Sequence, residues 1–135
     1  MNSKELVKYF YEQIFSRNLV DEIENYVDKK CNLRVGTEIF PIGLDGMKKH
    51  ISDVRETYPD FTIQVINQFS EKEYVISEII ATGTHKGVFL GIQPTNRKLT
   101  FTGIDVDKVE NGKIVEHSGA INTFETFIQE NIIKI

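Results

Sequence analysis

The sequence predicts one α+β domain that begins with helices and continues into strands that mostly pair with their sequence neighbours. In the N-terminal part, apolar residues recur with the period of a helix, and after residue 60 they alternate with polar residues. The pair Asn111-Gly112 joins the last two alternating segments and is a strong hairpin signal. This order favours an α+β fold over a wound parallel sheet. A chain of 135 residues with no repeat or linker is expected to form a single domain over residues 1–135.

Four helices are predicted. Residues 3–17 and 19–29 each carry an apolar stripe at helical spacing. A third helix follows Asp45, a plausible N-cap, and ends before Pro59. A last short helix is expected from residue 123.

Strands are predicted where the pattern changes to alternation. A first strand is expected within residues 31–40, after the second helix. The other predicted strands are residues 61–69, 74–84, 97–109 and 113–121. The segment His85–Asn96 contains two glycines and a proline and is too long for a tight turn, so it is expected to be a loop.

The hairpin at Asn111-Gly112 fixes a register for the last two strands, provided that no bulge interrupts it. On one face this register pairs Val109 with Ile114, Asp107 with Glu116, Asp105 with Ser118, and Phe101 with Asn122. His117 falls on the opposite, apolar face, where a core or interface role is expected. Two carboxylates facing each other destabilise a strand pair, and in a cleft they raise one carboxyl pKa, as a general acid or base requires. The register alone leaves two interpretations open, a solvated outer face and the lining of a cavity.

Composition and charge exclude several classes of protein. The net charge is −4 and basic residues occur only in short pairs, so no nucleic-acid partner is expected. No apolar run is long enough to cross a bilayer, and no membrane partner is expected. A single cysteine, Cys31, excludes an intramolecular disulfide, and a cytoplasmic location is expected. The His residues lack paired-ligand spacing and no phosphate-binding or cofactor motif is present, so neither a metal nor a cofactor is predicted.

Residues 83–122 carry a motif that resembles the signature of the SnoaL-like polyketide cyclases, a family of the nuclear-transport-factor-2-like superfamily. The matching positions, in order and spacing, are Gly83-Thr84-His85, Gly87, Gly91, Pro94-Thr95, Gly103-Ile104-Asp105, Gly112-Lys113-Ile114 and Glu116-His117. The resemblance implies a cone-shaped α+β barrel in which a curved antiparallel sheet wraps about three helices around an apolar pocket. It also implies a homodimer paired through the sheet.

The cyclases of this family close a ring by an intramolecular aldol condensation without a metal or an organic cofactor. A pocket aspartate takes a proton next to a carbonyl while neighbouring donors stabilise the enolate. The family pattern places positions 105, 116, 118 and 122 on the pocket side, in agreement with the bulge-free register. The resemblance therefore favours the cavity interpretation of the acidic face.

Four positions depart from the family pattern, among them Asp107, where an apolar residue is usual, and Asn96, where a glycine is usual. Asn122 holds the place of the catalytic aspartate and cannot act as a base, and Ser118 replaces a tryptophan. Asn122 has a second role open to it, the N-cap of the last helix.

These observations define the predicted site. Asp105 and Glu116 are the predicted acid–base residues, with His85 as a proton shuttle or oxyanion donor. The predicted ligand-binding residues are Asn122, Ser118, Phe101 and Glu78. Structural roles also stay open for four of them: Asp105 as a partner for backbone donors near Gly103, Glu116 as the partner of a basic residue, His85 as a group that orders its loop, and Glu78 as an edge residue.

Two functions follow from the sequence. One is a protein that binds an apolar small molecule and performs cofactor-free acid–base chemistry on it. The other keeps the fold without the chemistry and serves as a ligand-binding or protein-association module.

Overall fold

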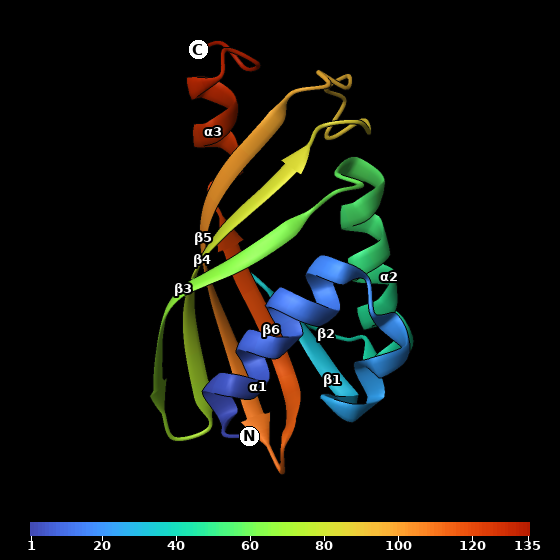
Figure 1. Ribbon diagram of the computed structural model, residues 1–135, viewed down its shortest axis with the longest axis vertical. Helices are drawn as coiled ribbons and strands as arrows, with labels where there is room; N and C mark the ends of the chain where they lie inside the picture. Colours follow the sequence, from blue (N-terminus) through green and yellow to red (C-terminus); the bar gives the residue numbers. More distant parts are fainter.

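The computed structural model describes residues 1–135 and shows one strongly twisted sheet with helices packed against its concave side (Figure 1). The helical segments are α1 (Ser3–Tyr9), η1 (Phe10–Phe15), η2 (Val20–Asn25), α2 (Gly43–Thr57) and α3 (Thr123–Gln129). The strands are β1 (Val27–Val35), β2 (Glu38–Pro41), β3 (Thr62–Glu71), β4 (Tyr74–Thr84), β5 (Lys98–Glu110) and β6 (Lys113–Ile121). The six strands lie in the order β2-β1-β6-β5-β4-β3.

The predicted α+β cone fold is confirmed, with two differences in the sheet. The sheet is mixed rather than fully antiparallel, because β1 runs parallel to β6 while every other neighbouring pair is antiparallel. The sheet is also open, since β2 and β3 form its two edges and do not pair with each other.

The first helical segment spans the predicted residues but changes its winding. Asn2 caps α1, where its Oδ1 accepts a hydrogen bond of 2.8 Å from the backbone N–H of Glu5. From Phe10 the chain continues as the π-helical turn η1. Such turns are often found at functional sites. Here η1 buries Tyr11 and Phe15 toward the sheet.

The predicted helix over residues 19–29 is wrong in its second half. A short 3₁₀ turn, η2, ends at Asn25, and β1 begins at Val27. Val27 and Cys31 are both fully buried. Their four-residue spacing fits either a helix or a strand, so the apolar pattern did not separate the two. The single strand expected over 31–40 is a hairpin of β1 and β2 that turns at Gly36, where φ is +61°.

The four long strands agree with the prediction, and β4 and β6 have the predicted bounds. Asn111 and Gly112 both have positive φ, 52° and 75°, as the expected hairpin turn requires. The helix expected from Asp45 begins earlier, at Gly43, and no side chain caps it.

The predicted register of β5 and β6 holds only next to the turn. Val109 faces Ile114, but one extra residue in β6 then shifts the pairing, so that Lys108 faces Glu116 and Asp107 faces His117. This β-bulge reverses the orientation of every later residue of β6. The predicted pairs of Asp107 with Glu116, Asp105 with Ser118 and Phe101 with Asn122 are therefore wrong. The bulge places an imidazole, instead of a second carboxylate, against the buried Asp107.

The core lies between the concave face of the sheet and the helices, and 23 buried residues form one hydrophobic cluster. No helix has the length and apolar character needed to cross a membrane.

Candidate functional site

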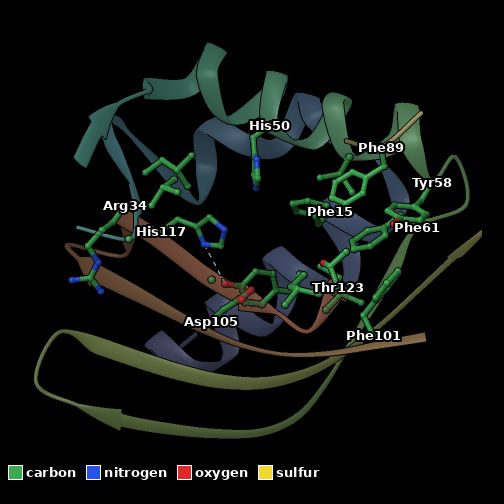
Figure 2. Close-up of a pocket in the computed structure, with 18 residues that line it drawn as sticks. Phe15, Arg34, His50, Tyr58, Phe61, Phe89, Phe101, Asp105, His117 and Thr123 are labelled. Atoms are coloured by element: carbon green, nitrogen blue, oxygen red, sulfur yellow. Dashed lines mark hydrogen bonds between the residues drawn. The ribbon is translucent and has the colours of Figure 1, made fainter. Parts of the chain in front are cut away.

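A cavity of about 300 Å³ separates α2 from the sheet (Figure 2). Eighteen residues line it and eleven of them are hydrophobic. One part of the wall is aromatic and includes Phe15, Tyr58, Phe61, Phe89 and Phe101. The polar groups Asp105 and His117 lie on the sheet side of the cavity, and His50 faces them from α2. A mostly apolar cavity with a few convergent polar groups has the properties of a small-molecule site.

A buried hydrogen-bond network underlies the polar part of the cavity. Asp107 is fully buried and accepts a hydrogen bond from the Tyr11 hydroxyl at Oδ2. Its Oδ1 lies 2.7 Å from Nδ1 of His117, which also lies 3.2 Å from the Tyr11 hydroxyl. A buried carboxylate requires such partners, because burial removes its hydration. Because Asp107 binds Nδ1, the Nε2 atom on the other side of the His117 ring is available for a hydrogen bond to a ligand.

The environment of His117 favours its protonated form. Burial by itself lowers the pKa of this imidazole, but the charge of Asp107, the hydrogen bond to Asp107 and the charge of Asp105 together raise it above 6.5. The pKa of Tyr11 is raised well above its ordinary value by burial and by the two nearby carboxylates, so Tyr11 remains a neutral donor.

Asp105 lies beside this network, where the charge of His117 and the nearby Tyr11 hydroxyl only partly offset the effect of burial on its pKa. Its side chain is buried, and Oδ1 has no hydrogen-bond partner. Burial raises the pKa of Asp105 to about 6, against the lowering effect of the positive charge on His117. A carboxylate in this condition accepts a proton readily from a bound molecule.

Gly119 leaves the space that Asp105 occupies. A Cβ atom on residue 119 would overlap Oδ1 of Asp105 and would lie 2.9 Å from its Cγ. Gly119 faces Asp105 across the β5–β6 pair, and both residues line the cavity. The absence of a side chain at Gly119 therefore positions the carboxylate of Asp105.

His50 enters the cavity from the opposite side. It projects from α2 toward the sheet, and its ring centre lies 5.8 Å from that of His117 (Figure 2). Burial first, and the charge of His117 second, lower the pKa of His50 to about 4, while Asp53 acts in the other direction. His50 is therefore neutral at pH 7.

Of the residues predicted for the site from the sequence, the structure brings Asp105 and Phe101 together in the cavity wall. The inward face of β5 is thus the predicted one.

Glu116, Ser118, Asn122 and Glu78 do not line the cavity. Glu116 and Ser118 both contact Arg34, at 3.6 Å and 3.4 Å. Asn122 donates a hydrogen bond of 3.2 Å from Nδ2 to the Thr102 hydroxyl. It precedes α3 in the chain, but its side chain makes no capping hydrogen bond to that helix. Glu78 accepts a hydrogen bond of 3.3 Å from Asn67 on the other surface of the sheet. For Glu116 and Ser118 the physical reason is the bulge, which turns both away from the cavity.

His85 is fully buried but is not part of the cavity wall. Its Nδ1 accepts a hydrogen bond of 3.3 Å from the backbone N–H of Thr95 and lies 3.1 Å from the Thr95 hydroxyl. These contacts join the two ends of the loop between β4 and β5. The structure therefore gives His85 the loop-ordering position that the sequence left open.

Sequence reasoning missed His117, Asp107, Tyr11 and His50 as site residues. The bulge-free register turned His117 away from Asp107. The signal that was available is the pairing that this register required, two carboxylates side by side on a buried face, which a bulge relieves.

The comparisons with known proteins agree with this architecture. The model of the SnoaL-like polyketide cyclase family matches residues 5–130. The chain belongs to this family. No curated protein matches it significantly.

Solved structures share the fold of this SnoaL-like protein at low sequence identity. A SnoaL-like polyketide cyclase from Agrobacterium tumefaciens has a TM-score of 0.82 at 16% identity, with 97% of this chain and 99% of that chain covered. IdmH from Streptomyces antibioticus has a TM-score of 0.81 at 19% identity, with coverage of 97% and 99%. TsrD from Streptomyces laurentii has a TM-score of 0.81 at 16% identity, with coverage of 98% and 99%.

The side chains of this SnoaL-like protein form no group of three or more His, Cys, Asp or Glu arranged to hold a metal ion.

The raised pKa of Asp105 predicts a pH-dependent gain of stability in Asp105→Asn. The folded protein binds this proton more tightly than the unfolded chain, because the pKa is about 6 when folded against an ordinary 3.8. Ionisation of Asp105 therefore lowers the free energy of unfolding by its full amount above pH 6. This loss disappears as the pH falls below 3.8, the ordinary pKa of an aspartate. In urea unfolding we expect Asp105→Asn to be roughly 1–3 kcal/mol more stable than wild type at about pH 7.5.

The difference should shrink toward zero at about pH 4. Glu116→Gln, which removes a carboxylate outside the cavity, is the matched control and should change stability by less than about 1 kcal/mol. A loss of stability in Asp105→Asn at both pH values would contradict this assignment.

Proposed function

We propose that this SnoaL-like protein binds an apolar small molecule with a carbonyl group in the cavity and transfers a proton at the carbon next to that carbonyl. The observation that carries the proposal is the buried Asp105 carboxylate, which has an unpartnered oxygen and shares an apolar cavity with the Asp107-supported His117. The cavity volume of about 300 Å³ is at the lower end of the range for small-molecule sites and suits a ligand of one or two rings.

The proton transfer uses two groups with different charge. The Asp105 carboxylate takes the proton from the carbon, and the electron pair of the broken C–H bond moves to the carbonyl oxygen. That oxygen takes a proton from Nε2 of His117, while Asp107 keeps its hydrogen bond to Nδ1. Asp105 and His117 both become neutral, and the product is an enol. Ring closure would follow when the same carbon attacks a second carbonyl group of the ligand.

The mechanism requires an ionised Asp105 and a protonated His117, and both forms exist together in one pH range. Asp105 is ionised above its pKa of about 6, and His117 is protonated below its raised pKa. Groups whose surroundings shift their pKa values in this way serve as base and acid. The rate is therefore expected to rise as the pH passes 6 and to fall at a higher pH, where His117 loses its proton.

A second candidate function is ligand binding without turnover. Asn122 supports it, because an amide replaces the aspartate of the family at this position. The measurement of proton exchange separates the two functions, since binding alone exchanges no carbon-bound proton.

The proposal predicts that the protein catalyses exchange of the carbon-bound protons next to the carbonyl of α-tetralone, a two-ring ketone, in D₂O. NMR follows the loss of that proton signal. We expect Asp105→Asn and His117→Gln to lower the catalysed rate by at least about 10²-fold, because each removes one partner of the transfer. Binding of α-tetralone without catalysed exchange in wild type would favour the second function.

Two further variants sharpen this test. Gly119→Ala keeps the Asp105 carboxylate but fills its position, so it should also lower the exchange rate. Glu116→Gln lies outside the cavity and should leave the rate unchanged. Equal rates in Gly119→Ala and wild type would show that the observed placement of Asp105 is not required.

We also propose that the convex face of the sheet pairs with a second copy of the chain. Large hydrophobic side chains are exposed there, with exposed fractions of 52% for Ile66, 58% for Phe69, 40% for Ile76 and 53% for Ile104. These residues lie on the neighbouring strands β3, β4 and β5. An apolar patch of this kind is typical of a protein–protein interface.

The homodimer proposal predicts that Ile104→Lys shifts the protein to a monomer, because it places a charge within an apolar interface. Light scattering coupled to size exclusion measures the mass. Leu90→Lys is the control, since Leu90 is also exposed but lies in the loop after β4. A wild-type mass equal to the 15.5 kDa of one chain would contradict the proposal.

A further inference from the structure

His50 is a cavity group that the proposed proton transfer does not use. Its side chain extends from α2 into the cavity, on the side opposite Asp105 (Figure 2). Burial and the charges of His117 and Asp53 shift the pKa of His50, and no hydrogen bond contributes to this shift. The imidazole therefore faces the cavity with its hydrogen-bonding capacity unused.

The neighbours of His50 fix its ring. The Phe15 ring packs edge-on against it, with ring centres 5.9 Å apart and an angle of 79° between the planes. The His117 ring lies on another side at 5.8 Å and 55°. Both contacts are between rings and occupy neither nitrogen of His50. The packing therefore orients the ring and leaves both nitrogens available to another molecule.

A neutral imidazole offers one N–H donor and one nitrogen acceptor. Such a ring in a largely apolar cavity loses hydration when a ligand fills the space, and it requires a polar atom of that ligand in return. Val54, which lines the cavity one turn further along α2, has no polar side-chain atom that could hydrogen-bond to His50.

We propose that His50 is a ligand-binding residue that holds a second oxygen of the ligand, close to the oxygen held by His117. This inference rests on the proposed function, because it assumes that the cavity binds a carbonyl or hydroxyl compound. The short separation of the two histidine rings, 5.8 Å between centres, favours two oxygens that lie near each other on one edge of the ligand. The ligand class is then a flat one- or two-ring molecule with two oxygen substituents in a 1,3 arrangement, separated by one unsubstituted ring carbon.

The experiment compares the dissociation constants of four probes by titration calorimetry. Naphthalene has no oxygen, 2-naphthol has one, 1,3-dihydroxynaphthalene has two on one edge, and 2,6-dihydroxynaphthalene has two on opposite edges. In wild type we expect the second oxygen of the 1,3 compound to increase affinity by roughly threefold to tenfold over 2-naphthol. The second oxygen of the 2,6 compound should add nothing.

Two variants of His50 complete the design. His50→Phe keeps a ring against Phe15 without polar atoms and should lose the gain from the second oxygen while still binding 2-naphthol. His50→Gln keeps a donor and an acceptor and should retain most of the gain. The imidazole ¹⁵N resonances of His50 in wild type should also shift when the 1,3 compound is added, which tests the contact without a substitution.

The outcomes separate this inference from the proposed function. If wild type binds 2-naphthol and His50→Phe retains the whole gain from the second oxygen, His50 does not hold it and the inference is wrong. If wild type shows the same affinity for the 1,3 compound and 2-naphthol, the inference is also wrong while the binding cavity stands. If wild type binds none of the four probes, both the proposed function and the inference about His50 are wrong.

Discussion

The fully buried carboxylate of Asp107 pairs with His117 and accepts a hydrogen bond from the Tyr11 hydroxyl, and the arrangement of the site depends on these contacts. They join three parts of the chain, η1, β5 and β6, on the concave side of the sheet. A buried negative charge without such partners costs several kcal/mol. The bulge in β6 makes the contact available, because it turns His117 inward where a regular hairpin would place Glu116. Both the orientation of His117 and its raised pKa follow from this pairing.

The same arrangement leaves Asp105 in an unfavourable position. The short hydrogen bonds of Tyr11 and His117 go to Asp107, and Oδ1 of Asp105 has no partner in the cavity wall, although both groups also lower the pKa of Asp105. Gly119 is what allows the carboxylate to remain there, since any side chain would displace it. Such stored instability is common at functional sites, where a group that is poorly satisfied by the protein is available to a ligand. The stability of the fold and the reactivity of the site thus oppose each other at Asp105.

Much of the fold could be predicted from the sequence, because the long strands alternate regularly and Asn111-Gly112 permits two successive positive φ angles. The segment around Val27 could not, since apolar residues four apart satisfy both a helix and a strand, and pairing with β6 decides between them. At the site, the inward face of β5 was predicted correctly from Asp105 and Phe101. The β6 half was not, because the alternation around Val115 is too short to locate an inserted residue, and the only signal of the bulge was the unfavourable pairing of two carboxylates that the regular register required. His50 was also beyond prediction, as only tertiary packing brings α2 opposite β6.

The measurement that tests the account most directly is the pH titration of the His117 imidazole by ¹⁵N and ¹H NMR in the wild-type protein and in Asp107→Asn. If Asp107 holds Nδ1, the Nδ1 proton is present throughout, and the ring releases its second proton only above the ordinary value of 6.5. Replacing Asp107 with Asn should lower that midpoint, because the neutralising charge is lost. A wild-type midpoint below 6.5, unchanged in Asp107→Asn, would contradict the central role of this pair.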